Sequence, residues 1–274
     1  QNAKQIVVQK VRECEKRNIF NKFKEIENSI VSANVRKTDE KGNLYVDING
    51  LEAIVPAKEL SPVDIFRQGD RIKIYIGAVE ESTKFTKTFV SRKSEELLRG
   101  LLELEVPEIY EEIIEIRNIA REAGSRSKVA VYSNDENLDV KGACIGRNGM
   151  RIQNIIDELC GEKIDIVLWN EDITEFVKNA LNPAEVLSVE IIEEGEENMK
   201  VARVLVAENQ LSLAIGKKGQ NSRLAARLCG VKIDIHTEPA EIDEFEEYEE
   251  DTAFNDSFED EVEESAFAGL HEED

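Results

Sequence analysis

The pattern of apolar and polar positions repeats itself in the second half of this chain. In each copy a short apolar-periodic stretch ends in Ile-Gly-x-x-Gly, and a second stretch then runs to Leu-Cys-Gly and Lys-Ile-Asp-Ile. The glycine turns, at 146–149 and 216–219, are 70 residues apart, and the Lys-Ile-Asp-Ile segments are 69 apart. Two copies of this length predict a duplicated small domain, because a solenoid needs more and usually shorter units.

The same periodicities predict the elements of each copy. For residues 171–240 we expect a helix at 173–181, strands at 186–194 and 200–208, a short helix from Asn209 or Gln210 to 215, a helix to 229 and a strand at 231–237. For residues 94–170 we expect a helix at 94–104, strands around 113–120 and at 128–133, a helix on each side of the turn (the second at 149–160) and a strand at 163–169. This order predicts two tandem type II KH domains. Hardly any linker separates them, so we expect them to pack as one rigid unit.

Residues 27–93 have the pattern of an all-β module. Turn signals separate five short strands, at 29–37, 43–48, 51–55, 71–79 and 85–91. Five strands in this length suggest a small barrel, and the OB fold is the commonest such architecture that binds nucleic acid. Tyr45 and Phe85 lie on strands where a base could stack, although either ring could instead pack inside the barrel. The expected fold class is α+β and multidomain, with a five-stranded OB-type barrel before two KH domains.

Residues 1–26 have a charged, helical pattern. Their apolar positions are Ile6, Val7, Val11, Ile19, Phe20 and Phe23. An isolated helix of this kind has little to pack against, and the chain begins at Gln1 without Met. We therefore expect a fragment in which this stretch is the last helix of a truncated N-terminal head domain.

Residues 241–274 form an acidic segment with 17 Asp and Glu and no Lys or Arg. Such a segment cannot bury enough apolar surface to offset its chain entropy, so we expect it to be disordered alone. It could be a solvating tail, or an RNA-mimicking or partner-binding tail, since its spaced aromatic residues exceed what solubility needs.

The formal net charge of −23 argues at first sight against a nucleic-acid partner. However, the acidic segment accounts for most of it, because the rest of the chain has 41 acidic and 35 basic residues. Locally basic surfaces are therefore compatible with this composition.

The remaining composition excludes several kinds of function. Four cysteines (14, 144, 160 and 229) form no Cys-x-x-Cys pair and there are only two histidines, so we predict no metal site, no disulfides and buried, reduced thiols. No apolar run approaches the roughly 18 residues of a membrane span and no signal peptide opens the chain. We expect a cytoplasmic, monomeric protein without a membrane partner.

No catalytic or cofactor site is predicted either. Neither glycine turn has the Gly-Lys-Ser/Thr of a Walker A loop, and Gly142, Gly146 and Gly149 have the wrong spacing for a dinucleotide fingerprint. His236 has little around it to orient it as a base, so we expect a structural or surface residue.

The two glycine turns point to RNA. Glycine at both ends lets the backbone adopt unusual dihedrals and leaves no Cβ to block a phosphodiester chain. The following helix directs free N–H groups and its positive dipole end toward that chain. Bases would lie beside the apolar helix face and the edge strand, where a KH fold typically clamps four nucleotides. One such turn is a weak signal, but two within the same predicted element order are a strong one.

The residues between and after the glycines set the charge. Lys217 and Lys218 place two ammonium groups on the second loop, so we expect this loop to supply more of the electrostatic affinity for RNA. Arg147 and Asn148 place a forked guanidinium and an amide on the first loop, so we expect this loop to contribute more to positioning the RNA. Arg151 and Arg223, one turn further along, are expected to reach the same RNA backbone. The predicted RNA-binding residues are Ile145, Gly146, Arg147, Asn148, Gly149, Arg151, Ile215, Gly216, Lys217, Lys218, Gly219, Gln220, Asn221 and Arg223, together with Tyr45 and Phe85 of the barrel.

Four stretches carry a family resemblance: VPEIY at 106–110, AREAGSRSK at 120–128, GACIGRNG at 142–149 and NQLSLAIGKKGQNSRLA at 209–225. With the order barrel, KH, KH, they resemble the NusA family of bacterial transcription elongation, termination and antitermination factors, over residues 1 to about 240. The family commonly has Asp-Pro-Val before Gly142, where this chain has Asp139-Val140-Lys141. Loss of the proline removes a preset first helical turn, so we expect a looser helix start.

The resemblance implies a role in pausing, termination and antitermination, with single-stranded nascent RNA, RNA polymerase near its RNA exit channel and other antitermination factors as partners. It also implies weakened polymerase binding, because the head domain that makes the main contact is almost wholly missing. Two alternatives remain open. Polynucleotide phosphorylase also combines KH and OB-type modules, although in the reverse order and after catalytic domains, and a ribosome-associated KH scaffold would share these motifs.

Overall fold

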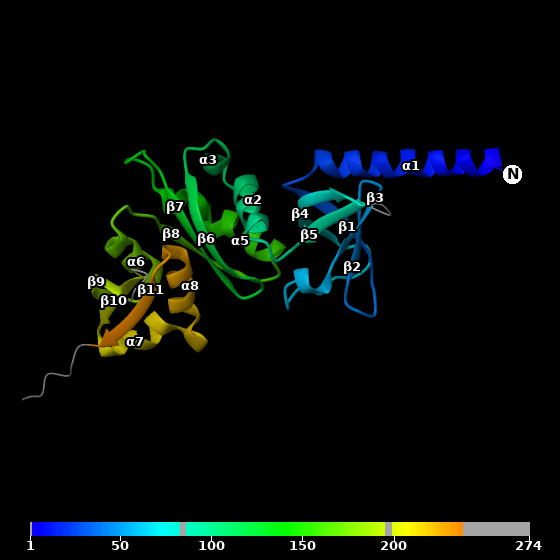
Figure 1. Cartoon of the computed structure of the whole chain (residues 1–274). Coiled ribbons are helices and arrows are strands. Elements are labelled where there is room, and N and C mark those ends of the chain that lie inside the picture. The colour runs from blue at the N-terminus through cyan, green and yellow to red at the C-terminus, as the bar shows by residue number, and fades with distance from the viewer. Residues whose placement is uncertain (1, 83–85, 195–198, 238–274) are drawn as a thin grey trace, which may run out of the picture. The chain divides into compact units, whose positions relative to one another are not determined.

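The computed structural model describes residues 2–82, 86–194 and 199–237, whose elements are labelled in Figure 1. The first β module contains β1 (Ser29–Thr38), β2 (Leu44–Ile48), β3 (Leu51–Val55), the 3-10 turn η1 (Ala57–Glu59), β4 (Arg71–Glu81) and β5 (Thr86–Ser91). Its antiparallel sheet has the order β3-β2-β1-β4-β5, and β3 also contacts β5, so the sheet nearly closes. Alternate side chains such as Leu44, Val46 and Ile48 fill the interior. The predicted five-stranded OB-type barrel is confirmed.

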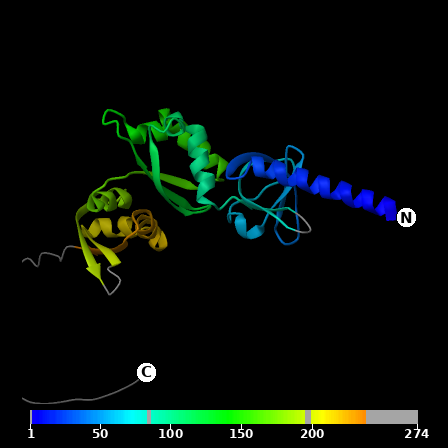
Figure 2. The ribbon, with the colours of Figure 1, turned by 45° about the horizontal axis from the view of Figure 1, so that its top comes forward.

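Helix α1 (Asn2–Glu25) ends against this barrel. Phe23 is buried in the barrel core, and Phe20 and Ile26 pack on it. The expectation that this stretch has little to pack against is therefore wrong for its last turns. The N-terminal half projects beyond the strands in both views (Figures 1 and 2), and there Ile6 and Val7 are exposed.

Two α+β units with the same element order follow. The first contains α2 (Glu95–Glu105), α3 (Pro107–Tyr110), β6 (Glu115–Glu122), β7 (Arg126–Tyr132), α4 (Val140–Ile145), η2 (Arg147–Gly149), α5 (Met150–Glu158) and β8 (Lys163–Leu168). The second contains α6 (Ile173–Leu181), β9 (Val186–Glu194), β10 (Met199–Val206), α7 (Glu208–Ile215), η3 (Lys217–Gly219), α8 (Gln220–Cys229) and β11 (Lys232–Thr237). In each sheet the middle strand pairs antiparallel with the strand before it and parallel with the last strand. The predicted KH element order is confirmed in both copies.

The first unit differs from the sequence prediction near its start. The strand predicted around 113–120 begins at Glu115, because Ile114 is buried in the turn that follows α3, a short helix that the periodicity did not predict. Helix α4 has a side-chain cap in place of the missing proline: the Asp139 carboxylate accepts from the Gly142 N–H at 2.9 Å. This cap supplies the start signal that the sequence seemed to lack.

The sequence analysis expected buried thiols, and this is wrong for two of the four cysteines. Cys144 is buried and Cys229 half-buried, whereas Cys14 and Cys160 are exposed. Burial raises the pKa of both Cys144 and Cys229 to about 12, so these two thiols are inert at neutral pH.

One hydrophobic cluster contains side chains of both KH units, and the first unit has a second cluster of its own. Ala120, Ala130 and Val167 of the first sheet lie in the same cluster of buried side chains as Leu181 and Leu224 of the second unit. Helix α8 packs against β6 and β7, and the Asn118 side-chain amide donates to the Leu228 carbonyl at 2.7 Å. The predicted packing of the two copies against each other is confirmed.

The β6–β7 hairpin adds buried charges to this packing. Arg121 and Glu162, with side chains 2% and 0% exposed, form two parallel hydrogen bonds of 2.9 Å. The same guanidinium donates to the Ser94 carbonyl at the start of α2, and the Ser127 hydroxyl donates to Glu162 at 2.6 Å. Both carboxylate oxygens and the guanidinium are thus paired, as buried charges require.

The next residues of the hairpin reach the second KH unit. Lys128, with no exposed side-chain surface, donates to the Asp165 carboxylate at 3.3 Å and to the Asn182 carbonyl at 3.2 Å. Burial lowers the pKa of this ammonium, and Asp165 opposes that shift. Arg126 donates twice to the same Asp165, at 2.6 and 2.8 Å. The motif at 120–128 is therefore a structural junction.

Arg92 joins the barrel to the first KH unit. Its side chain is 1% exposed and donates to Asp64 Oδ1 at 3.0 Å, to the Lys73 carbonyl at 2.6 Å and to the Glu158 carbonyl at 2.9 Å. It also lies over the Phe66 ring at 4.8 Å. One side chain thus ties β4 and a barrel loop to the end of α5.

None of the helices in the described ranges is long and apolar enough to cross a membrane.

Replacing Arg92 by Ala should lower the free energy of unfolding by about 3–5 kcal/mol, because the Asp64 carboxylate loses its buried cation. Urea denaturation followed by circular dichroism measures this. Arg36→Ala is the matched control: Arg36 is 61% exposed and pairs with Asp47, so its loss should cost less than about 1 kcal/mol. Equal losses in the two variants would contradict the role given to Arg92.

Candidate nucleic-acid interface

The first Gly-x-x-Gly loop joins α4 to α5 through a backbone in unusual conformations. Gly146 ends α4 with φ 77° and ψ 170°, and its N–H donates to the Gly142 carbonyl at 2.8 Å. Asn148 and Gly149 follow in the left-handed region, with φ 55° and 75°. Asparagine tolerates this region better than most residues.

The second loop has nearly the same backbone. Gly216 has φ 73° and ψ 173°, Lys218 has φ 54° and Gly219 has φ 72°. The Gly216 N–H donates to the Ser212 carbonyl at 2.9 Å, as Gly146 does to Gly142. A lysine held in the left-handed region carries strain of about 1 kcal/mol or more, and such strain clusters at functional sites. The repeat therefore preserves a backbone shape while its side chains differ.

The two glycines of each loop are required for different reasons. A Cβ on Gly146 would lie 2.6 Å from Arg151 Cγ, and one on Gly216 would lie 2.7 Å from Asn221 Cβ, so the first glycine lets the following helix approach closely. A Cβ on Gly149 would meet nothing within 4 Å, and one on Gly219 nothing nearer than 3.9 Å. The second glycine is therefore required because of its positive φ, and its lack of a side chain leaves open space in front of the helix.

The loop tips carry exposed positive charge. Arg147, Asn148, Lys217 and Lys218 are all exposed. In the described part of the chain, no salt bridge joins Arg147, Lys217 or Lys218 to a carboxylate. No side chain caps α5 or α8. The N–H of the first residue of each helix donates within the loop instead, from Met150 to the Arg147 carbonyl and from Gln220 to the Lys217 carbonyl. Each loop lies at a helix N-terminus, as the sequence analysis predicted.

Arg151, which the sequence analysis expected to reach the RNA backbone, is bound to protein atoms in the structure. Its Nη1 donates to the Ala143 carbonyl at 2.6 Å and to Glu108 Oε2 at 2.9 Å. Because its stem lies directly behind Gly146, this arginine supports the loop from inside. Glu108, in the VPEIY motif, is thereby tied to the loop.

Arg223 and Gln220 contact the first KH unit. Arg223 Nε donates to Glu122 Oε1 at 2.7 Å, and Gln220 Nε2 donates to Glu122 Oε2 at 2.8 Å and to Ser125 Oγ at 2.7 Å. The Arg223 hydrogen bond, followed by that of Gln220, lowers the pKa of Glu122. Arg223 also donates to the Lys218 carbonyl at 3.3 Å. These residues therefore fix the second loop relative to the β6–β7 hairpin.

Asn221 is turned inward. It is 6% exposed, and its Nδ2 donates to the carbonyls of Leu181, Leu213 and Ala214 at 2.9, 3.2 and 3.1 Å. The amide closes the end of α7 and joins it to α6. The structure gives this predicted RNA-binding residue a role in loop support.

An apolar surface adjoins each loop. Ile145 and Ile215, the last residues of α4 and α7, are 38% and 39% exposed. Helix α4 packs against the edge strand β8, and α7 packs against β11, so loop, helix and edge strand lie together as predicted. Met150 and Leu213, which the sequence analysis did not name, are also exposed. The sequence could have indicated their exposure, because each is an apolar residue next to the loop that does not lie on the buried face of its helix.

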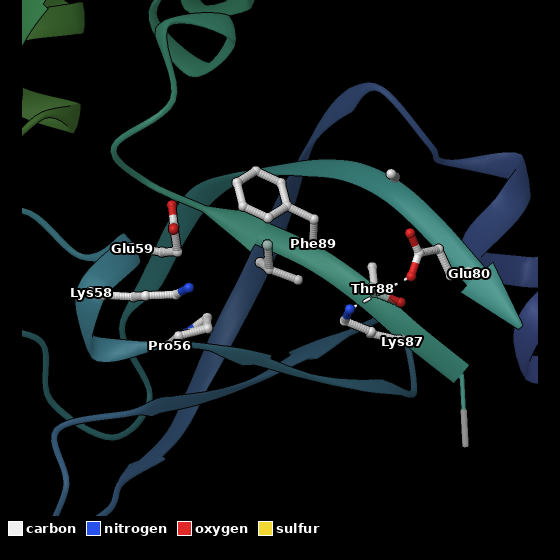
Figure 3. Close-up of a pocket in the computed structure, with 9 residues that line it drawn as sticks. Pro56, Lys58, Glu59, Glu80, Lys87, Thr88 and Phe89 are labelled. Atoms are coloured by element: carbon white, nitrogen blue, oxygen red, sulfur yellow. Dashed lines mark ion pairs between the residues drawn. The ribbon is translucent and has the colours of Figure 1, made fainter. Parts of the chain in front are cut away.

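The barrel presents two aromatic side chains. Tyr45 is half-buried on β2, with Lys37 Nζ 4.9 Å from its ring centre. Phe85 lies outside the described residues. Phe89, which was not predicted, is 44% exposed on β5 (Figure 3). Its exposure could have been predicted from the sequence, because side chains alternate along a strand and its neighbours Thr88 and Val90 face inward.

Among the residues with described structure, no group of three or more His, Cys, Asp or Glu side chains could hold a metal ion. His236 is exposed and lies 3.0 Å from Asp234, on the outer face of β11.

An OB-type barrel followed by two KH units with matching glycine loops defines a chain built from nucleic-acid-binding modules. Residues 24–86 match the S1 RNA binding domain, residues 92–169 the NusA-like first KH domain and residues 173–243 the NusA-like second KH domain.

Three relatives are each described as a transcription termination/antitermination protein NusA. Those from Halalkalibacterium halodurans and Bacillus subtilis are both 48% identical over 238 residues, which is 87% of this chain and 61% and 63% of the relatives. The Thermus thermophilus relative is 47% identical over 247 residues, 90% of this chain and 62% of the relative. The chain belongs to the NusA family, and it spans less than two thirds of the length of these relatives.

Replacing Gly216 by Ala should destabilise the protein by about 2 kcal/mol or more, and replacing Gly219 by Ala by only about 1 kcal/mol. Both positions have positive φ, but only a Cβ at 216 meets neighbouring backbone, the Asn221 nitrogen at 2.9 Å. Urea denaturation of the two variants measures the difference. Equal costs would mean that helix α8 moves away from Gly216 without penalty.

Proposed function

We propose that this chain binds single-stranded nascent RNA along its two KH loops and thereby modulates pausing, termination and antitermination of transcription. The observation that carries the proposal is the matched pair of loops: the same backbone dihedrals, exposed cations and an uncapped helix N-terminus occur twice. Each loop offers N–H donors, positive charge and close access for a phosphodiester backbone. The protein acts in this proposal by binding, without catalysis.

The contacts between the KH units support a single RNA path. Glu122, at the end of β6, binds both Gln220 and Arg223 at the start of α8. The second loop is therefore anchored to the first KH unit within one residue of its last glycine. Because both loops belong to one packed unit, a strand bound at one is expected to continue to the other, and the second binding event gains from high effective concentration.

The two loops divide the work in this proposal. Lys217 and Lys218 contribute two point charges, whereas Arg147 and Asn148 offer a planar fork and an amide that hold a phosphate in one orientation. Bases then contact the apolar surface that begins at Ile145 and Ile215. Arg151, Gln220, Asn221 and Arg223 serve by shaping the loops.

Membership of the NusA family supports the remaining partners. We propose RNA polymerase as the machine on which the bound RNA acts, other antitermination factors as further partners, and the cytoplasm as the location. The chain would work there as a monomer.

Replacing both Lys217 and Lys218 by Asp should weaken binding to an unstructured RNA of about twelve nucleotides by roughly ten- to a hundredfold near 0.1 M salt. The slope of log K against log salt should become flatter by about 1.4, since each lost phosphate contact removes about 0.7. Fluorescence anisotropy across a salt series measures both quantities.

The control is Lys4→Asp with Lys22→Asp, which changes the net charge equally on exposed residues of α1. An unchanged affinity in the loop variant would mean that this loop does not carry the RNA. An equal loss of RNA affinity in the control would mean that the loop variant weakens binding only through its change in net charge.

The transcriptional role is tested with purified bacterial RNA polymerase on a template that contains a pause site and an intrinsic terminator. The unaltered chain should change pause lifetime or termination efficiency, and the Lys217→Asp, Lys218→Asp variant should lose most of that change because its grip on the emerging RNA is weaker. No effect of the unaltered chain at concentrations that saturate RNA binding would contradict the transcriptional proposal while leaving RNA binding intact.

A further inference from the structure

One carboxylate of the first KH unit binds the helix that follows the second loop. Glu122 is the last residue of β6, and its Oε1 accepts from Arg223 Nε at 2.7 Å while its Oε2 accepts from Gln220 Nε2 at 2.8 Å. Arg227 Nη1 lies 4.0 Å from the same Oε1. The three partners are three or four residues apart, so they lie on one face of α8. This face is turned toward the first KH unit.

Arg223 continues this contact into the second loop. Its Nη1 donates to the Lys218 carbonyl at 3.3 Å. Lys218 is the residue of this loop that has a side chain and nevertheless lies in the left-handed region, with φ 54°. Residues other than glycine are uncommon in that region and persist there where the surrounding structure holds them. Glu122 is thus connected, through one arginine, to the strained residue of the lysine-rich loop.

The first loop has the same backbone but is built differently. At the position equivalent to Lys218, 70 residues earlier, it has Asn148, and asparagine tolerates the left-handed region. At the position equivalent to Arg223, helix α5 has Gln153, which donates to Asp157 of its own helix at 2.8 Å. The support from the neighbouring KH unit therefore occurs at the loop whose left-handed residue is a lysine.

The charge of Glu122 and its contacts have opposite effects on RNA binding. A carboxylate beside a lysine-rich loop lowers the local positive potential, so its charge alone weakens binding to phosphates. Its contacts hold the loop in place, and Gln220 extends them by donating to Ser125 Oγ at 2.7 Å. The Glu122 and Arg223 side chains are 22% and 44% exposed, so solvent screens the charge while the geometry of the contacts remains. The two effects are therefore separable by experiment.

We propose that Glu122 is a positioning residue for RNA binding by the second KH loop. It holds Arg223 on the Lys218 carbonyl and so keeps Lys217 and Lys218 in the conformation that binds a phosphodiester backbone. The proposal rests on the proposed RNA-binding function and adds a residue of the first KH unit to the second loop. An acidic side chain here strengthens binding to an acidic ligand, because the loop is already ordered before RNA arrives.

Glu122→Ala should weaken binding to an unstructured RNA of about twelve nucleotides by about fivefold, because RNA must then order the strained loop. The loss should persist between about 0.1 and 0.3 M salt, over which exposed charges are increasingly screened. Fluorescence anisotropy measures the affinities, and thermal unfolding checks that the variant is folded. A gain in affinity that fades as salt is added would overturn the proposal, because charge alone predicts that result.

Glu171→Ala is the matched control. Glu171 is an exposed acid between the two KH units, and its replacement changes the net charge by the same amount. It should leave RNA affinity unchanged or raise it slightly. A loss in this control equal to that of Glu122→Ala would refute a particular role for Glu122.

The Lys217→Asp, Lys218→Asp variant distinguishes this proposal from the proposed function. If that variant loses affinity and Glu122→Ala does not, the positioning role is refuted and RNA binding by the loop stands. If neither variant loses affinity, RNA binding by the second loop itself fails.

A double-mutant cycle with Lys218→Asn gives a readout that a general structural role would not change. Asparagine adopts the left-handed region at the equivalent position of the first loop, so a loop with this substitution no longer needs the support of Glu122. In the Lys218→Asn background, Glu122→Ala should therefore weaken RNA binding by about twofold or less. An equal fold loss in both backgrounds would show that Glu122 acts independently of the loop conformation, and the proposal would fail.

Discussion

The buried ion pair between Arg121 and Glu162 is the constraint on which the rest of this structure depends. Both side chains are almost fully removed from water, so each must find a complete set of partners. The guanidinium is satisfied by Glu162 and the Ser94 carbonyl, and the carboxylate by Arg121, Ser127 and the Gly124 N–H. These partners come from α2, the β6–β7 hairpin and the start of β8. In this arrangement of the elements neither buried charge is left without a partner.

Similar polar contacts join the first KH unit to the barrel on one side and to the second KH unit on the other. On the barrel side, Arg92 binds carbonyls of both β4 and the end of α5. On the other side, Glu122 at the end of β6 binds Arg223 of α8. Polar contacts of this kind are directional, so they define orientation, while the shared apolar core supplies most of the free energy. The consequence for function is that the glycine loops are held by side chains that bind protein atoms on other elements.

In the KH domains, several polar residues that follow the glycine loops support those loops. Arg151, Asn221 and Arg223 are polar residues that follow the glycine loops, yet each one binds protein atoms. The two residues between the glycines and the apolar residues beside them are exposed, and in the described part of the chain no salt bridge pairs the cations of these loop tips with a carboxylate. A loop of this kind is preorganised, so a bound strand does not have to pay for ordering it.

The sequence by itself determined the order of modules, nearly all helices and strands, and the two glycine loops, because periodicity and positive-φ glycines are local properties. It did not reveal α3, the packing of α1 on the barrel or the exposure of Cys14 and Cys160. Nor did it show which cations are bound by the protein itself: Arg223 and Lys218 look alike as cations, and only Arg223 binds Glu122, some hundred residues earlier in the chain. Such partners meet through tertiary packing, which no local pattern encodes. The same holds for the Phe89 ring, which lies against Gly77 of a neighbouring strand.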